Sequence, residues 1–319
     1  MERKLSFVIP CYRSENTVMR VVDEIEETVV LRPEYDYEII LVNDGSPDNV
    51  WDVISKRVNT DNKIIGINLS KNFGQQSALM AGYNHVSGDL IVSLDDDGQT
   101  PACDVFKLID ELDKGYDIVY AQYPLVKRSW FRRLGSDFAK KMSDYMFNYK
   151  DNNRASSFYV ARRFIIEEMI RYKNPYPYLI GLVLRTTRNF SFVDIVHRER
   201  YEGKSGYNLR SLFSLWVNGF TAFSVKPLEI GTYLGFVTAF LGFIFAVITI
   251  IRKLFITPDM EAGWSSIISV MLIVGGVIML MLGLIGEYVG RIYICLNDSP
   301  QFVVKEIMQK NSEEKINHG

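Results

Sequence analysis

The chain has 319 residues, with 36 lysines and arginines against 38 aspartates and glutamates, a formal net charge of −2, and 48% hydrophobic residues. This composition excludes general disorder, and near-neutrality argues against a nucleic-acid partner. The three cysteines show neither metal-ligand spacing nor the pattern of a disulfide framework: Cys11, Cys103 and Cys295. We therefore expect them to lie in the reducing cytosol.

The first part of the chain alternates short apolar strands with helices. Strands are predicted at 5–10, 38–42, 64–69, 90–94 and 118–121, and helices at about 16–30, 48–59, 74–86 and 103–112. This alternation predicts an α/β fold with a mostly parallel sheet covered by helices on both faces. Ligands of such sheets bind at the carboxyl ends of the strands, here the polar segments 10–15, 43–48, 70–75 and 95–99.

Two of these segments carry carboxylates that could bind a cation or a nucleotide. Asp95 and Asp97, at positions i and i+2 after a strand, can share one hard cation that grips a diphosphate. Asp44 could accept hydrogen bonds from a base or ribose. The alternatives are a solvated acidic turn at 95–97 and an Asx-type turn at Asp44 that caps the next helix.

Basic and aromatic residues are mixed in segments 125–149 and 209–223. Amphipathic helices of this composition beside a membrane usually lie in its interface, although an ordinary solvated helix face is the alternative.

Two uncharged apolar blocks follow, at 230–251 and 264–286. Each exceeds the roughly 20 residues that a helix needs to cross a bilayer core, so we expect a transmembrane hairpin rather than two buried core helices. Six glycines suit close helix contact in lipid: Gly231, Gly235, Gly242, Gly275, Gly276 and Gly283. No signal peptide is recognisable, so both termini are expected in the cytoplasm.

Several motifs, in order and spacing, resemble family 2 glycosyltransferases of the GT-A fold. They are VIPCY at 8–12, VNDGSPD at 42–48, LSKNFGQQSALMAGYNHVSGD at 69–89 and LDDDGQTP at 94–101. With HRERYEGKSGY at 197–207, the two spans and GEYVGRIY at 286–293, the chain is similar to polyprenyl-phosphate glycosyltransferases. That group includes dolichol-phosphate mannose synthases, bactoprenol glucosyltransferases and undecaprenyl-phosphate aminoarabinose transferases, and the resemblance covers about residues 4–305.

The resemblance implies an enzyme that transfers one sugar from a nucleotide-sugar, expected to be a UDP-sugar, to undecaprenyl phosphate with inversion. The product would serve cell-wall glycan, lipopolysaccharide or other surface modification, and the cofactor would be Mg²⁺ or Mn²⁺. The expected location is the inner (cytoplasmic) membrane, among its lipids, and relatives suggest a homotetramer.

Four regions are expected along the chain. Residues 1–208 would form the cytosolic GT-A domain, with an interface helix at about 128–146. A juxtamembrane amphipathic helix at 209–227, the two transmembrane helices within 228–286 and a cytosolic tail at 287–319 would follow.

The resemblance also assigns site residues by position. Catalytic roles fall on Asp95, Asp97, Gln99, Ser157 and Arg200. Nucleotide-sugar binding falls on Pro10, Tyr12, Glu15, Asn43, Asp44, Lys71 and Asp96. Acceptor-phosphate binding falls on Arg128, Arg132, Arg133, Lys204 and Ser205, and metal binding on Asp95 and Asp97.

The chain departs from the family pattern at Asn43 and Ser157, where relatives carry Asp, and at Gly206, where they carry Lys. The Asp at the position of Ser157 is a candidate base. A lipid monophosphate has a second pKa of about 6 and is largely dianionic at neutral pH, so the acceptor needs no deprotonation and we expect activity. The alternatives are a donor-binding scaffold without turnover and a processive polysaccharide synthase, whose Gln-x-x-Arg-Trp motif is missing.

Overall fold

The computed structural model describes residues 3–123, 156–196, 198, 226–255, 263–297 and 299–310. The chain divides into two compact units, one formed by Met1–Leu212 with Ser299–Gly319 and the other by Phe213–Asp298. The predicted interface helix at 128–146 and most of the juxtamembrane helix at 209–227 lie outside the described residues.

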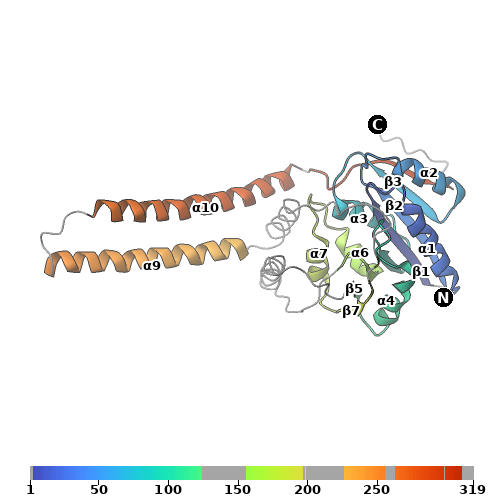
Figure 1. Cartoon of the computed structure of the whole chain (residues 1–319), viewed down its shortest axis with the longest axis horizontal. Helices are drawn as coiled ribbons and strands as arrows, with labels where there is room; N and C mark the ends of the chain where they lie inside the picture. Colours follow the sequence, from blue (N-terminus) through green and yellow to red (C-terminus); the bar gives the residue numbers. More distant parts are fainter. Residues whose placement is uncertain are drawn as a thin grey trace. The chain divides into compact units, whose positions relative to one another are not determined.

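The first unit is built on one sheet of eight strands in the order β7-β5-β6-β4-β1-β2-β3-β8. Figure 1 labels β1, β2, β3, β5 and β7 of this sheet. The strands are β1 Arg3–Cys11, β2 Tyr35–Asn43, β3 Ile64–Leu69, β4 Leu90–Ser93, β5 Ile118–Gln122, β6 Tyr159–Arg162, β7 Phe190–Asp194 and β8 Val304–Gln309. β4, β1, β2 and β3 form a parallel core, whereas β6 and β8 run antiparallel to their neighbours. The mostly parallel α/β sheet predicted from sequence is confirmed.

The helices of this unit are α1 Val18–Val30, α2 Val50–Thr60, α3 Gln75–Tyr83, a 3₁₀ turn Ala102–Asp104, α4 Val105–Leu112, α6 Arg163–Met169 and α7 Leu179–Thr186. Successive residues of a strand point to opposite faces, so β1 presents Phe7 and Ile9 to the core that contains α1 and α2. Val8 points the other way, toward α3, where a Cβ on Gly82 would lie 2.4 Å from its Cγ1. Helices therefore cover both faces of the sheet.

β8 lies within the segment 287–319, for which the sequence predicts a C-terminal tail and no strand. It pairs antiparallel with β3 at the edge of the sheet, and the Ser70 N–H donates to the Val303 carbonyl at 2.9 Å. The Gln301 side chain is buried and donates to the backbone carbonyl of Asn174 at 2.9 Å. A strand at the edge of a sheet is partly exposed to solvent and commonly carries charged residues, here Lys305 and Glu306. Its sequence therefore resembles that of a polar tail.

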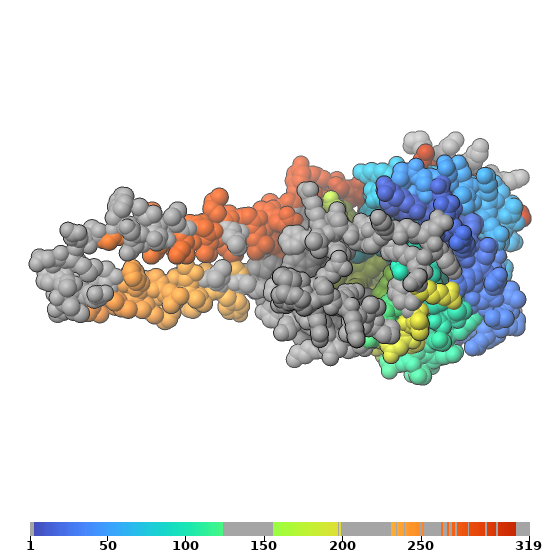
Figure 2. Space-filling view, in the orientation of Figure 1, coloured from blue at the N-terminus to red at the C-terminus, as the bar shows by residue number. Residues whose placement is uncertain are grey.

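The second unit contains α9 Lys226–Phe255 and α10 Trp264–Leu296, drawn in orange and red in Figure 2. Among the described residues, one stretch, Ile273–Leu296, is long and apolar enough to cross a membrane, and α9 contains a shorter apolar stretch, Gly231–Phe245. α10 continues past the predicted end of the span at 286.

One of the six glycines of this unit contacts the opposite helix. A Cβ on Gly231 would lie 2.3 Å from the Met281 sulfur, so this glycine does allow close packing of α9 on α10. At the other five predicted contact glycines, an added Cβ would have no described atom within 4 Å. Among the described residues, Gly231 is thus the one of the six that meets the opposite helix, and close helix contact at the other five stays a prediction.

Candidate active site

The four polar segments that the sequence analysis selected all follow strands of the parallel core. The register pairs Cys11 with Asn43 and Asn43 with Asn68, while Val8 lies opposite Ser93. Because neighbouring parallel strands end at the same edge, the loops after β1, β2, β3 and β4 adjoin one another as predicted.

Asp44 ties the loop after β2 to the loop after β3. Its buried carboxylate accepts the backbone N–H groups of Phe73 at 2.7 Å and Gly74 at 2.9 Å. Burial raises the pKa of Asp44 to about 6, against these two hydrogen bonds, which lower it. Gly45 adopts a φ of +56°, and a Cβ there would lie 2.3 Å from the Lys71 carbonyl carbon, so the two loops touch at a residue without a side chain.

Both polar atoms of the Asn43 side-chain amide form hydrogen bonds. Its Nδ2 donates to Asn68 Oδ1 at 2.8 Å, and its Oδ1 accepts the Ser46 N–H at 3.0 Å. The side chain that closes the turn after β2 is therefore Asn43 rather than Asp44, which the sequence analysis had considered for that role.

Hydrogen bonds of Glu15 and Asp48 connect the loop after β1 to the start of α2. Asp48 accepts the Glu15 N–H at 3.0 Å, and Glu15 in turn accepts the Asn49 N–H at 2.9 Å. The remaining predicted donor residues lie near these loops: Pro10 within β1, Tyr12 with a half-exposed ring, and Lys71 with its amine 5.1 Å from the centre of the Phe73 ring.

The acidic turn, which we define as residues 95–99, follows β4 and brings two predicted catalytic residues together. Asp95 Oδ1 accepts the Gln75 side-chain amide at 2.7 Å, and Asp95 Oδ2 accepts the Ser157 hydroxyl. Asp97 Oδ1 accepts the Gln99 N–H at 3.0 Å. Ser157, 62 residues away in sequence, is thus a direct partner of Asp95.

Asp96, between these two carboxylates, points toward the loop after β1. Its Oδ2 accepts the Tyr12 N–H at 3.0 Å. Burial raises the pKa of Asp96 to about 6, the Tyr12 N–H lowers it, and the charges of Asp95 and Asp97 raise it further. Asp96 therefore links the acidic turn to the loop after β1.

The carboxylates of the acidic turn suit one kind of divalent cation site. Among the described residues, no three His, Cys, Asp or Glu side chains converge to hold a metal by themselves. Mg²⁺ and similar ions are commonly bound by one or two carboxylates together with substrate phosphates and water. Asp95 and Asp97 fit such a shared site, and a cation held by protein ligands alone does not fit the described residues.

Sequence reasoning missed two residues that contact the site. Gln75 holds Asp95, although the sequence offers nothing to distinguish it from Gln76, which accepts the Leu179 N–H. Arg198 donates its backbone N–H to the Gln99 carbonyl at 3.1 Å. Both contacts depend on the tertiary fold rather than on a local pattern.

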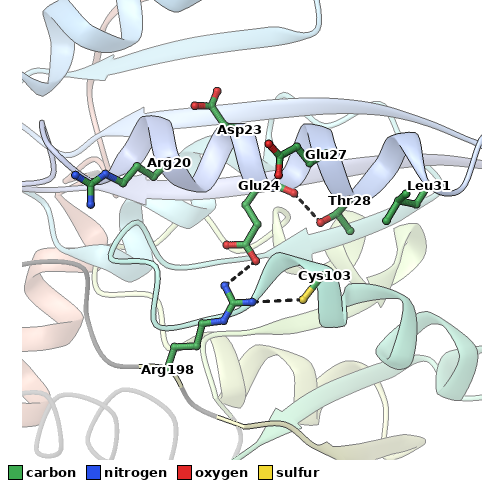
Figure 3. A pocket seen from close by; sticks show the side chains of 8 residues that line it. All are labelled: Arg20, Asp23, Glu24, Glu27, Thr28, Leu31, Cys103 and Arg198. Carbon is green, nitrogen blue, oxygen red and sulfur yellow. Dashed lines mark hydrogen bonds and ion pairs between the residues drawn. The ribbon is translucent and has the colours of Figure 1, made fainter.

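Six predicted site residues lie outside the described residues: Arg128, Arg132, Arg133, Arg200, Lys204 and Ser205. A separate open hollow lies beside α1 and contains none of the predicted site residues (Figure 3). It is lined by Arg20, Asp23, Glu24, Glu27, Thr28, Leu31, Cys103 and Arg198.

Two family models match the chain. Residues 6–170 match "Glycosyl transferase family 2", and residues 226–292 match "GtrB C-terminal hairpin".

Relatives match over nearly the whole length. YkcC, an uncharacterized glycosyltransferase of Bacillus subtilis (strain 168), is 32% identical over 94% of this chain and 93% of its own. The undecaprenyl-phosphate 4-deoxy-4-formamido-L-arabinose transferase of Yersinia pestis (strain Pestoides F) is 31% identical over 98% of this chain and 96% of its own.

The fold is shared with solved structures. Glucosyl-3-phosphoglycerate synthase from Mycobacterium tuberculosis, in complex with Mn²⁺, UDP-glucose and phosphoglyceric acid, superposes with a TM-score of 0.52 at 19% identity. The match covers 69% of this chain and 78% of that one, and it confirms the predicted GT-A-like α/β fold.

Proposed function

Because the chain belongs to glycosyl transferase family 2, we propose that it transfers one sugar from a nucleotide-sugar, expected to be a UDP-sugar, to undecaprenyl phosphate. The proposal depends most on one observation: the acidic turn stands at the edge of the sheet where α/β folds bind ligands. The name of the Yersinia relative, which matches 98% of this chain, supports the acceptor.

The chain's own residues would divide the work between two substrates. The loops after β1 and β2, with Tyr12, Glu15 and Asn43, would hold the nucleotide. The predicted acceptor residues at 128–133 and 204–205 would hold the lipid phosphate. An acceptor oxygen would then attack the anomeric carbon from the side opposite the leaving diphosphate, which inverts the configuration.

Deprotonation of the acceptor would not limit this reaction. A phosphate monoester is largely dianionic at neutral pH, so its oxygen is already a nucleophile. Ser157, whose hydroxyl donates to Asp95, cannot serve as a carboxylate base, and we assign it the role of orienting Asp95. Catalysis would rest on alignment of the two substrates and on stabilising the leaving group.

Asp95 and Asp97 would hold a divalent cation, Mg²⁺ or Mn²⁺. When bound, this cation would supply positive charge to the departing diphosphate. The Mn²⁺ and UDP-glucose in the Mycobacterium structure support a cation of this kind in a shared fold.

The two helices of the second unit would anchor the enzyme in a membrane. α9 and α10 are each longer than the roughly 20 residues that span a bilayer core, and they match a hairpin model. We propose a pair of spans in the inner membrane with the catalytic unit and both termini in the cytoplasm, where the nucleotide-sugar is available. Assembly into tetramers remains a prediction.

The direct test uses the full-length protein in detergent with undecaprenyl phosphate and a panel of labelled UDP- and GDP-sugars, with Mn²⁺ or with EDTA. We expect label from one UDP-sugar to enter the organic phase with Mn²⁺ and not with EDTA. Transfer from a GDP-sugar alone would show that the donor is a GDP-sugar and not a UDP-sugar. Tight donor binding in a calorimeter without transfer would instead establish a donor-binding scaffold.

A further inference from the structure

Gln99, the last residue of the acidic turn, bonds to Asp97 through its N–H and to the distant Arg198 through two other polar groups. Its N–H donates to Asp97 Oδ1 at 3.0 Å. Its carbonyl accepts the Arg198 N–H at 3.1 Å, and its side-chain amide reaches the Arg198 carbonyl at 3.5 Å. The position of the Gln99 peptide, and with it the orientation of Asp97, therefore depends on where the Arg198 backbone lies.

The Arg198 side chain is in turn fixed to helix α1. Its Nη1 donates to Glu24 Oε1 at 2.9 Å, an ion pair between residues 174 positions apart, and its Nη2 lies 3.6 Å from the Cys103 sulfur (Figure 3). The Glu24 side chain is only 17% exposed, which protects the pair from full solvent screening. The contacts form a continuous chain from α1 through Arg198 and Gln99 to Asp97.

We infer that Glu24 and Arg198 are positioning residues that hold the acidic turn in its working geometry. Neither side chain needs to touch a substrate: Glu24 fixes the Arg198 guanidinium, Arg198 fixes the Gln99 peptide, and the Gln99 N–H orients Asp97. This inference rests on the proposed function, because Asp97 matters only where the acidic turn holds the donor diphosphate.

The expected size of the effect follows from the kind of contact. A partly exposed ion pair contributes little to global stability, so its loss should not unfold the protein. The same loss leaves the turn beside Asp97 with one fewer restraint, and small misplacements of catalytic groups reduce turnover. We expect a fall in turnover of about 5-fold, which corresponds to the upper range of such a pair.

The test compares neutral and conservative variants of the full-length enzyme. Glu24→Gln and Arg198→Met should each lower turnover about 5-fold and weaken binding of Mn²⁺ with UDP, measured by electron paramagnetic resonance. Arg198→Lys keeps the charge and should remain within about 2-fold of wild type. The matched control is Glu167→Gln, which breaks the Arg163–Glu167 ion pair on α6. This control should leave turnover unchanged. Cys103→Ser, which alters only the 3.6 Å sulfur contact, should lower turnover less than Arg198→Met does.

Hydrogen exchange supplies a readout that does not require turnover. In Glu24→Gln and Arg198→Met, the amides of Gln99 and Arg198 should exchange about 5-fold faster than in wild type and in Glu167→Gln. Variants indistinguishable from wild type in both turnover and exchange would overturn the inference. If wild type itself transfers no sugar, the proposed function fails, and unchanged exchange at Gln99 would still overturn the positioning role separately.

Discussion

The two sides of the candidate site use their carboxylates differently. In the loops after β1 and β2, Asp44, Asp48 and Glu15 accept backbone N–H groups from neighbouring segments. In the acidic turn, Asp95 is held by the side chains of Gln75 and Ser157, and Asp97 accepts one N–H from within the turn, that of Gln99.

This difference separates carboxylates that shape the loops of the site from carboxylates that are available to bind a cation. A carboxylate that satisfies backbone N–H groups shapes the loops around it, so its loss should be felt as instability. Asp95, held by neutral side chains, and Asp97, which accepts one N–H from within its own turn, are oriented while their charge remains available to a cation. Substitution of Asp44 should therefore cost mainly stability, and substitution of Asp95 or Asp97 should cost mainly turnover.

The largest effect is expected from Asp97→Ala. Removing a proposed cation ligand should lower turnover on the order of 10²-fold or more, with little change in melting temperature. Sugar transfer and thermal unfolding, measured together, check this. Asp110→Ala, at an exposed position of α4, is the control, and near-wild-type turnover of Asp97→Ala would disprove the assignment of the acidic turn.

Asp44→Ala should lower the stability of the protein more than its turnover. It leaves the N–H groups of Phe73 and Gly74 without their acceptor, and we expect a loss of about 2 kcal/mol in the free energy of unfolding. Thermal unfolding in detergent measures this, with Asp52→Ala on α2 as the control. A large loss of donor affinity at unchanged stability would show that Asp44 holds the nucleotide directly instead.

The pH dependence of stability sharpens the same contrast. Burial raises the pKa of Asp44 from its ordinary 3.8 to about 6, so its ionised form is disfavoured in the folded protein. Its contribution is therefore greatest below about pH 4 and is lost as the pH rises through about 6. Relative to Asp44→Asn, wild type should lose about 2 kcal/mol between pH 4 and pH 7, seen as a steeper fall in melting temperature. Parallel curves for the two proteins would contradict this.

The smallest effects are expected at Ser157. Ser157→Ala removes one donor to Asp95 and should lower turnover by about 3- to 5-fold. Ser157→Asp should change turnover by less than about tenfold, because a dianionic acceptor needs no base. Ser156→Ala, whose hydroxyl bonds to backbone carbonyls instead, is the matched control. A very large gain in Ser157→Asp would mean that the reaction does require a carboxylate base.

The strands and helices up to Leu112 could be predicted from sequence because each is a continuous apolar or amphipathic run. The predicted strand at 38–42, for example, lies within β2 Tyr35–Asn43. The edge of the sheet that bears the site followed from the same alternation. β8 could not be predicted, because polar and apolar residues are mixed in its short run VKEIMQ and its partner β3 lies far away in sequence.

The hydrogen-bond partners of individual site residues also could not be predicted from the sequence. The acidic turn was identifiable from LDDDGQ after a strand, but the choice of Gln75 rather than Gln76 as the partner of Asp95 depends on the rotation of α3. The link from Glu24 through Arg198 to Gln99 joins segments that no local pattern connects.

The position of β8 has a consequence for synthesis on the ribosome. β3 ends at Leu69 and its edge partner begins at Val304, so both long apolar helices are translated between them. At roughly 5–20 residues per second, the roughly 235 intervening residues take on the order of 10–50 s. During that time the β3 edge lacks its own partner strand and can pair with another chain. A nascent chain can thus add the edge strand β8 to this sheet only after both apolar helices have been translated.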